Sequence, residues 1–481
     1  MPNLNGPTCG ELADSANSAI LNRTLYSKPA ELVVAGHDSY LVTDSSDEIL
    51  DATAGPGVTC LGHSNKEVHQ AIIDQMQKIS YVYSGHNTTQ PAEDLAAFLI
   101  QESQGAFSKV LINSGGSEAT ETAIKIVRQY SLAKSLGSNP LTATREHIIS
   151  RFPSYHGNTL GALAVSGHPL RKGIFTPYLS AAPISFVSTC YPYRQLRDGE
   201  TEEQLCQRLL QELDDEFQKH DGNVAAFWME PVSGTSQACT PSLKGYIPGV
   251  KKLCKKYGAL LVMDEILCGM GRTGYLFSWM EDGSVEDAAP DLMTCAKALG
   301  GGYGPISAVL MTEEVARVLN ESGGYNGGFT YQSHTLACTA SLAVQRIIKR
   351  DNLLENVRQM GELLFSLLRE HLKDAPYIGE IRGRGLQIGV EFVKDRATKE
   401  PLPPRTRFAG RLLEHAWEKE RLSMLLGMGT VHKDGEVSGD TILLLPMYII
   451  KEKEVREIAD RFARSVEAVS AIVMKELSDQ T

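Results

Sequence analysis

A lysine, Lys297, closes the short apolar run DLMTCAK (291–297) and is followed at once by the glycine-rich turn ALGGGYGP. Taken alone, a lysine is most often an ordinary surface residue. An amine nucleophile, however, must be held on a stiff element and partly desolvated so that it is neutral near pH 7. The end of a buried strand provides both conditions, so Lys297 is a candidate nucleophile, with room for a substrate above the glycines.

A carboxylate, Asp264, lies in the segment VMDEILCGMGRTG at the expected carboxyl end of a second buried strand. Open parallel sheets bind their ligands at this edge, and a carboxylate buried there needs a cationic partner. A protonated pyridine nitrogen would be such a partner, and the carboxylate would keep that ring able to accept electrons from a developing carbanion. The alternative is an aspartate that caps the next turn.

The segment VLINSGGSEATETAIKIVRQY (110–130) places a strand first, then two glycines between serines, and then an amphipathic helix. Glycines let the backbone approach an anion, which the N–H groups and the dipole at the start of the helix attract. The segment thus predicts a phosphate cradle at Gly116, where the hydroxyl of Ser117 adds a donor. A capping box with Ser117 as N-cap and Glu121 close to the box position is the alternative.

An aromatic residue, Tyr155, follows the strand-like run EHIISRF (146–152) in the sequence Tyr155-His156-Gly157. Its ring could lie on one face of a planar cofactor. Core packing is the alternative for a lone tyrosine.

Three glycines, Gly269, Gly271 and Gly274, also spell GxGxxG, the dinucleotide fingerprint, after a strand as that motif requires. The residues that follow, YLFSWMEDG, do not resemble the start of a helix, and the motif lies in the middle of the chain. A nicotinamide oxidoreductase is therefore a distant alternative. The 12 histidines form no HExxH pattern and no GxSxG elbow occurs, so the sequence predicts neither a metal site nor a serine hydrolase.

The elements that must position these residues alternate between short apolar runs and helical patterns, which is typical of an α/β domain with a mostly parallel sheet. The predicted strands are SKVLIN (108–113), EHIISRF (146–152), AAFWMEPV (225–232), ALLVMDEI (259–266), DLMTCAK (291–297) and SAVLM (307–311). The clearest helix is predicted over 247–257, because its apolar residues share one face and Gly258 follows as a natural stop.

The pattern changes from about residue 335 to long amphipathic helices around one short strand, IRGRGLQIGVEF (381–392). A length of 481 residues fits two to three domains. We expect residues 1–60 to pack with the small domain, 61–330 to form the large cofactor-binding domain and 331–481 to form the small domain.

The composition argues against several kinds of partner. The chain has 47 Lys and Arg against 58 Asp and Glu, a net charge of −11, without a basic stripe, so we expect no nucleic-acid partner. The N-terminal residues do not resemble a signal peptide, and no run is apolar enough for a membrane span, so we expect no membrane partner. Nine cysteines without a CxxC pair fit a cytoplasmic protein.

Seven motifs, in this order, resemble those of class III aminotransferases, which are fold type I pyridoxal-phosphate enzymes. They are NSGGSEATETAIK, YHGNTLGA, MEPV, MDEILCGMGRTG, AKALGGGYGP, GFTYQSH and RGRGLQIGVEF, and the resemblance runs from about residue 30 to 470. It implies an α/β large domain with a mostly parallel central sheet plus a smaller α+β domain. It also implies a transaminase that uses pyridoxal 5′-phosphate to move an amino group from an amine to an oxo acid such as pyruvate or 2-oxoglutarate.

The resemblance implies a role for each matching residue. Lys297 would form the Schiff base, Asp264 would face the pyridine nitrogen, Ile266 and Tyr155 would lie on opposite ring faces, Gly116 and Ser117 would hold the phosphate, and Glu230 in MEPV would lie near the ring hydroxyl and the substrate. Thr330 in GFTYQSH would reach the phosphate of a neighbouring subunit, so the resemblance also implies a homodimer with shared active sites.

Two departures from the family pattern concern the substrate. Many members have a glutamine where Leu267 stands, and many have an arginine shortly before a Pro-Pro pair, where this chain has Leu443 and Met447. Losing a guanidinium that would bind a carboxylate favours an ω-amine substrate over an α-amino acid. Arg382 or Arg384 could substitute, although RGRG more often braces the small domain. A racemase or decarboxylase of the same fold is the alternative function.

Overall fold

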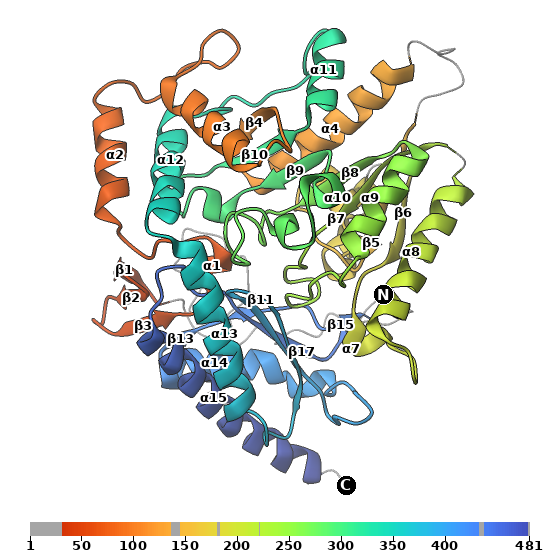
Figure 1. The fold of residues 1–481 in the computed structure, drawn as a ribbon. Helices are drawn as coiled ribbons and strands as arrows, with labels where there is room; N and C mark the ends of the chain where they lie inside the picture. The colour runs from red at the N-terminus through yellow and green to blue at the C-terminus, as the bar shows by residue number, and fades with distance from the viewer. Residues whose placement is uncertain (1–30, 136–144, 180–182, 221, 432–436, 480–481) are drawn as a thin grey trace.

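The computed structural model describes residues 31–135, 145–179, 183–220, 222–431 and 437–479 (Figure 1). Its centre is a seven-stranded sheet in the order β4-β10-β9-β8-β7-β5-β6. The strands are β4 (Lys109–Asn113), β5 (His147–Phe152), β6 (Ile184–Ser188), β7 (Val224–Met229), β8 (Leu260–Asp264), β9 (Leu292–Cys295) and β10 (Ser307–Met311). Only β10 runs antiparallel to its neighbours, so the predicted mostly parallel sheet is confirmed.

The central strands are buried on both faces, which explains their continuous apolar sequences. Every residue of β7 and β8 is buried. Helices α4 (Gly116–Ser135) and α11 (Glu313–Glu321) share one apolar cluster with the sheet. The larger cluster on the other face includes α3 (Gln90–Glu102), α8 (Glu202–Lys219), α9 (Tyr246–Tyr257) and α12 (Thr335–Arg350).

The helix expected over 247–257 is α9, which begins one residue earlier, at Tyr246. Ile247, Val250 and Cys254 are buried on one face, as their spacing predicts. Gly258 ends the helix with a φ of 64°, a left-handed conformation that glycine adopts without strain. The chain then passes directly into β8, and this fixes the start of the strand that ends at Asp264.

The C-terminal part forms a four-stranded sheet in the order β11-β12-β17-β14, and helices pack beside it. Its elements are α13 (Leu353–His371), β11 (Ile378–Arg384), β12 (Gln387–Phe392), α14 (Phe408–Glu420), β14 (Leu425–Leu426), β17 (Asp440–Leu444) and α15 (Glu452–Ser478). The expectation of one strand over 381–392 is wrong, because β11 and β12 form an antiparallel hairpin. The chain reverses at Gly385, where φ is 54° and a Cβ atom would lie 2.7 Å from the carbonyl carbon of Thr273.

The first described strands lie beside the C-terminal part (Figure 1). Strands β1 (Val33–His37), β2 (Tyr40–Thr43) and β3 (Glu48–Asp51) form an antiparallel ribbon, and β3 pairs in parallel with β13 (Leu422–Ser423). Residues 1–30 of the predicted N-terminal segment lie outside the described residues. The boundaries at 60 and 330 stay a prediction.

Shorter elements complete the described chain. They are α1 (Ala54–Gly57), α2 (Lys66–Met76), α5 (Leu160–Val165), α6 (Pro169–Lys172), η2 (Gly173–Tyr178), α7 (Pro192–Gln195), η3 (Ser278–Glu281), α10 (Val285–Ala288), η4 (Lys297–Leu299), η5 (Pro404–Thr406), β15 (Thr430–Val431) and β16 (Val437–Ser438). Eight cysteines are described, and all are buried free thiols. Among the helices in the described ranges, none is long and apolar enough to cross a bilayer.

Candidate active site

The predicted site residues follow strands of the central sheet at one edge. Asp264 is the last residue of β8, Glu230 comes directly after β7, and Lys297 lies two residues beyond β9. Tyr155 follows β5, and Gly116 follows β4, which is also antiparallel to β10. Because these five strands run in the same direction, the segments after them meet at the carboxyl edge of the sheet, where open α/β proteins bind ligands.

The backbone around Lys297 is held in an unusual conformation. Lys297 has a φ of 46°, in the left-handed region that residues with a side chain rarely adopt. Helix α12 fixes the turn that follows: the Ser341 hydroxyl donates to the carbonyl of Leu299 at 2.7 Å, and the Gln345 amide donates to the carbonyls of Ala298 and Leu299 at 2.9 Å. Such a conformation persists where surrounding contacts determine it, and it is concentrated at functional sites.

The environment of Lys297 makes its amine more acidic than usual. Burial lowers the pKa of Lys297 to about 8, although the negative charges of Asp264 and Glu230 act in the opposite direction. A larger fraction of the amine is therefore neutral near pH 7 than for an ordinary lysine. Neutral amine is the form that attacks a carbonyl carbon, so the position meets the chemical requirement for a nucleophile.

Asp264 is buried, with 4% of its surface exposed, and is held by two hydrogen bonds. Its Oδ1 accepts from the N–H of Ile266 at 3.0 Å, so the residue also caps the next turn, as its alternative interpretation predicted. Its Oδ2 lies 2.8 Å from Nδ1 of His156, which must donate because a carboxylate can only accept. The sequence interpretation did not single out His156, although it stands beside Tyr155 in the YHG motif.

Glu230 joins the segments that follow β5 and β7. Its Oε1 accepts from the N–H of Gly234 at 2.9 Å, and its Oε2 accepts from the N–H of Tyr155 at 3.3 Å. Burial raises the pKa of Glu230, while the positive charge on a protonated His156 would lower it and the negative charge of Asp264 adds to the rise. The backbone of Tyr155 is thereby fixed to the strand end next to Asp264.

The start of α4 has the form of an anion site. The helix begins at Gly116, so Ser117 already lies in its first turn and the capping-box interpretation is wrong. The Ser117 hydroxyl instead accepts from the N–H of Asn158 at 3.0 Å, and the Glu121 carboxylate accepts from the N–H of Gly161 at 3.0 Å. These contacts dock the loop after β5 against the N-terminus of α4, where free N–H groups attract a phosphate.

Ile266 lies against the same helix start, because a Cβ atom built on Gly116 would lie 3.1 Å from its Cδ1. Tyr155 lies edge-on to His168, with ring centroids 5.8 Å apart, and the Arg171 guanidinium is 4.7 Å from the centre of the tyrosine ring. Thr330 lies on an exposed turn, where its carbonyl accepts from the Tyr81 hydroxyl at 2.8 Å. The contact predicted for Thr330 is with the cofactor phosphate of a neighbouring subunit.

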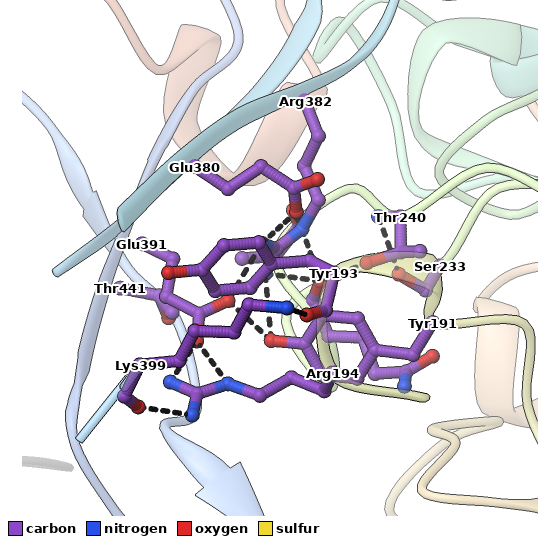
Figure 2. Close-up of polar contacts among 12 residues, drawn as sticks. Tyr191, Tyr193, Arg194, Ser233, Thr240, Glu380, Arg382, Glu391, Lys399 and Thr441 are labelled. Carbon is purple, nitrogen blue, oxygen red and sulfur yellow. Dashed lines mark hydrogen bonds and ion pairs between the residues drawn. The ribbon is translucent and has the colours of Figure 1, made fainter. Parts of the chain in front are cut away.

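The two arginines considered for substrate binding are engaged by protein groups. Nη1 of Arg382 lies 2.6 Å from Glu391 and 2.7 Å from Glu380 (Figure 2). Its Nη2 donates to the carbonyl of Gln237 at 3.1 Å. Nη1 of Arg384 pairs with Asp282 at 2.8 Å. Both therefore brace the C-terminal part against the central domain, as RGRG more often does, and these partners argue against the alternative that one of them replaces the missing arginine.

Apolar side chains form a cluster at the position where many family members have arginine. Leu443 is fully buried in β17 and packs with Ala238, Cys239 and Leu445, while Leu267 and Leu425 pack against them. This cluster, which we call the leucine cluster, borders Glu230: a Cβ atom on Gly234 would lie 3.1 Å from Leu267 and 3.6 Å from the Glu230 carboxylate. Apolar side chains therefore lie beside Glu230 in the loop after β7.

The GxGxxG segment does not form a dinucleotide site. The residues between β8 and η3 form turns, and the element after Gly274 is the four-residue η3, whereas the fingerprint requires an α-helix. The nicotinamide interpretation is therefore wrong. Within the segment, Arg272 is fully buried, donates to the carbonyls of Leu386 and Pro446, and lies 4.7 Å from the ring centre of Tyr448. The sequence motif contained this residue but gave no sign of its burial.

Pyridoxal phosphate fits this arrangement. A partly neutral amine can hold its aldehyde, a buried carboxylate can face its ring nitrogen, and the N-terminus of α4 can hold its phosphate. Gly157 lies close to Ser117: a Cβ atom built on Gly157 would lie 2.8 Å from the Ser117 hydroxyl. Because glycine has no side chain, the space where the cofactor's phosphate would bind is not filled there.

Comparisons with known proteins agree with this fit. The family model Aminotransferase class-III matches residues 26–466. An uncharacterized aminotransferase of Schizosaccharomyces pombe is 39% identical over 441 residues, which cover 91% of this chain and 93% of the relative. A gamma aminobutyrate transaminase of Solanum lycopersicum is 32% identical over 440 residues, which cover 89% of this chain and 79% of the relative.

A solved structure, the omega transaminase of Pseudomonas jessenii in complex with PMP, matches with a TM-score of 0.83 and 31% identity, covering 92% of this chain and 94% of that one. The match to the family model over nearly the whole chain favours amino transfer over the racemase or decarboxylase alternative. The chain belongs to the class III aminotransferases and is a pyridoxal-phosphate-dependent transaminase of fold type I, which transfers an amino group from an amine donor to an oxo acid.

Proposed function

We propose that this transaminase acts on an ω-amine, that is, an amine whose reacting carbon carries an apolar group instead of a carboxylate. The observation that carries the proposal is the leucine cluster beside Glu230. The preferred acceptor would be a small oxo acid such as pyruvate or 2-oxoglutarate. Relatives named gamma aminobutyrate transaminase and omega transaminase support this choice.

The physical argument concerns the cost of burying charge. A donor carboxylate placed beside Leu443 would lose its hydration without gaining a guanidinium partner, and an unpaired buried charge is strongly unfavourable. The donor's apolar group would therefore lie on this side, and the acceptor's carboxylate would bind on the other side of the reacting carbon. Arg382 and Arg384 already bind protein carboxylates. An apolar substituent, in contrast, gains about 25 cal/mol for each Å² that it removes from water.

Lys297, Asp264 and His156 would have different roles in the reaction. When bound, pyridoxal phosphate supplies an aldehyde that carries the amino group and a ring that accepts electrons. Lys297 would hold the aldehyde covalently and, once displaced by the amine, its Nζ would move the proton from the substrate carbon. Asp264, anchored by His156, would keep the ring nitrogen protonated.

The remaining residues would bind and orient the cofactor. Gly116 and Ser117 would hold its phosphate, Ile266 and Tyr155 would lie on opposite ring faces, and Glu230 would face the hydroxyl side. Contacts that support these places are the approach of Gly116 to Ile266 and the hydrogen bond between Glu230 and the Tyr155 backbone.

We also propose a homodimer in which Thr330 reaches the phosphate of the neighbouring active site. Apolar surface around Thr330 supports this: Tyr331 is 60% exposed and Tyr83 is 56% exposed, and the Tyr81 ring lies 5.9 Å from that of Tyr331. Exposed aromatic groups are enriched in protein interfaces. The free thiols support a further proposal, a cytoplasmic location, because reducing compartments keep thiols unpaired.

A panel of amine donors with pyruvate as acceptor tests the proposed substrate. We expect amines with aryl or alkyl groups to give faster alanine formation than α-amino acids, measured as kcat/KM. Leu443→Arg should shift this preference toward donors with a carboxylate. The control is Leu426→Arg, because Leu426 is an exposed leucine next to the same strand. A wild-type preference for α-amino acids would disprove the proposed specificity while leaving the transaminase assignment intact.

A further inference from the structure

A second group of potential ligands lies at the opposite edge of the central sheet from the active site. His147 is the first residue of β5, whereas the active-site segment follows the last residue of that strand, roughly 15 Å or more away at about 3.3 Å per residue. Glu216 lies near the end of α8, and His220 comes directly after that helix. We propose that His147, Glu216 and His220 bind a divalent transition-metal ion, for which Zn²⁺ is the best chemical match.

The geometry brings three donor atoms together. One ligand atom from each of the three side chains lies within 4.8 Å of the other two. Nε2 of His220 is 2.9 Å from Oε1 of Glu216, and Nε2 of His147 is 2.7 Å from the hydroxyl of Ser185. Donors at these separations need only small movements to surround an ion with bonds of about 2.0–2.2 Å.

The two elements that carry these residues are fixed relative to each other. The Glu212 carboxylate on α8 accepts from the N–H and the hydroxyl of Ser188 in β6, each at 3.0 Å. Strand β6 in turn pairs with β5, which carries His147. The site is therefore built on a rigid helix and strand, which holds its ligands better than a loop does.

The donor set is the one that Zn²⁺ prefers. Two imidazole nitrogens and one carboxylate oxygen form a three-ligand set, and water or the Ser185 hydroxyl can take the fourth position. Each neutral imidazole offers one ring-nitrogen lone pair to the ion, and the carboxylate offers an oxygen. Mg²⁺ and Ca²⁺ favour sites made only of oxygen, so they should compete poorly.

Binding requires two local adjustments. The rings of His147 and His220 are stacked, with centroids 3.5 Å apart and an interplanar angle of 20°, and parallel rings cannot both point a lone pair at one ion. The His220 side chain, which is 21% exposed, can turn about its Cβ–Cγ bond. Lys219 lies 3.2 Å from Glu216 and must release it, which its 65% exposure permits. We therefore expect affinity in the micromolar range.

Sequence spacing could not predict this site. His147 is separated from the other two residues by α5, α6, η2, β6, α7 and most of α8. The Glu-x-x-x-His spacing on a helix is too common to indicate a metal. The expectation that the chain has no metal site rested on the lack of known metal-binding motifs in the sequence. The proposed site has no such motif, because folding brings its three residues together.

The test uses the full-length holoenzyme without an affinity tag, treated with a chelator and then titrated with ZnCl₂ in excess Mg²⁺ by isothermal calorimetry. We expect one Zn²⁺ per chain and a higher Tm in its presence. His220→Asn and Glu216→Gln, both at half-buried positions, should each raise the Kd at least tenfold. His37→Asn is the control, because exposed His37 also lies beside carboxylates, Glu48 at 2.8 Å and Asp38 at 3.7 Å, but on opposite ring nitrogens, so the three do not converge on one point.

Three results would overturn the proposal. One is the lack of saturable Zn²⁺ binding in the wild-type protein. The second is an unchanged Kd in both the His220 and the Glu216 variant, provided that their cofactor absorbance and Tm in chelator match the wild type. Equal binding of Mg²⁺ and Zn²⁺ would also contradict it, because that result indicates an unspecific acidic surface.

Discussion

Among single residues, Lys297 has the most unusual backbone conformation in the candidate active site. Its backbone occupies the left-handed region, at a cost of about 1–3 kcal/mol for a residue with a side chain. Ser341 and Gln345 offset this cost by binding the turn that follows. The same contacts bring the amine into a site where burial makes it more acidic.

The pKa of Lys297 predicts how cofactor capture depends on pH. Since burial lowers that pKa to about 8, the neutral amine becomes the major form only above that value. The rate at which cofactor-free enzyme captures pyridoxal phosphate should rise with pH through about 8 and then level off. Stopped-flow absorbance between pH 6 and pH 10 measures this. A rate that keeps rising to pH 10 would show an ordinary lysine pKa.

The anchoring of Asp264 by His156 gives a second prediction. His156→Leu removes a charge-assisted hydrogen bond worth about 1.5–3 kcal/mol, so kcat should fall roughly 10- to 150-fold. His156→Asn is the matched control, because its amide can donate near the position of Nδ1 and should restore much of the rate. The cofactor's visible absorbance should shift only in the leucine variant. Equal rates in the two variants would show that the hydrogen bond has no role.

Single residues could be selected from the sequence where a charged residue stands at the end of an apolar strand, because charge is rare in such a position. A lysine and an aspartate at buried strand ends could be identified, and the family resemblance added Glu230 and Ile266. His156 and Arg272 were missed although their motifs were noticed. Their importance arises from burial and from partners distant in sequence, such as Asp264 for His156, and these follow from the fold.

At the scale of elements, the loop after β7 depends on the strand β12 of the C-terminal part. A Cβ atom on Gly389 in β12 would lie 2.0 Å from the carbonyl oxygen of Ala238. The same loop includes Gly234, whose N–H donates to the carboxylate of Glu230. The glycine thus lets the C-terminal sheet pack directly on a segment of the active site.

Gly389→Ala should therefore destabilise the protein. Overpacking of this kind costs about 1–3 kcal/mol, because backbone must move to relieve the clash. Gly173→Ala is the control, since a Cβ atom there meets no atom within 4 Å and φ is −42°. The midpoint of urea unfolding of each variant measures the difference. Equal midpoints for the two variants would mean that the contact at Ala238 is looser than the structure indicates.

The pattern of elements was mostly visible in the sequence. Continuous apolar runs identified the central strands because a parallel sheet is buried on both faces. The β11–β12 hairpin was missed, because Gly385 and Leu386 form a reversal too short to interrupt the apolar pattern of 381–392. Turn geometry at Gly385 depends on its contact with Thr273, which lies far away in the sequence.

At the scale of the whole molecule, a buried polar network joins the central domain to the C-terminal part. Glu391 in β12 binds Arg382 at 2.6 Å and Nε of Arg194 on α7 at 2.8 Å, and it also accepts from the Tyr191 hydroxyl (Figure 2). Breaking a buried ion pair by removing one partner typically costs about 3–5 kcal/mol. The network therefore fixes the relative position of the two parts on either side of the leucine cluster.

The proposed dimer makes a prediction at this scale. If Thr330 reaches the neighbouring phosphate, Thr330→Val should weaken cofactor binding about tenfold, since it removes one hydrogen bond to a charged group. The dimer mass from analytical ultracentrifugation should stay unchanged. Ser322→Ala, a change in a hydroxyl that donates within its own chain, is the control. A wild-type protein that sediments as a monomer would contradict both the dimer and this role.

Contacts between elements that are distant in the chain could not be predicted from the sequence. The Arg382 network and the group formed by His147, Glu216 and His220 each join residues from separate elements, which only the completed fold brings together. The sequence suggested that RGRG braces the C-terminal part, and the structure supplies the partners. Length suggested two to three domains, and both their number and their boundaries stay a prediction.

Covalent attachment of the cofactor at Lys297 is the central claim, and reduction with borohydride tests it most directly. The holoenzyme is reduced, digested and analysed by mass spectrometry, and the account predicts a pyridoxyl group on Lys297 alone. Lys297→Ala should lose both the label and amino transfer. Lys251→Ala is the control, because burial also lowers the pKa of Lys251, and it should keep both. A label on another lysine, or near-normal turnover by Lys297→Ala, would contradict the account.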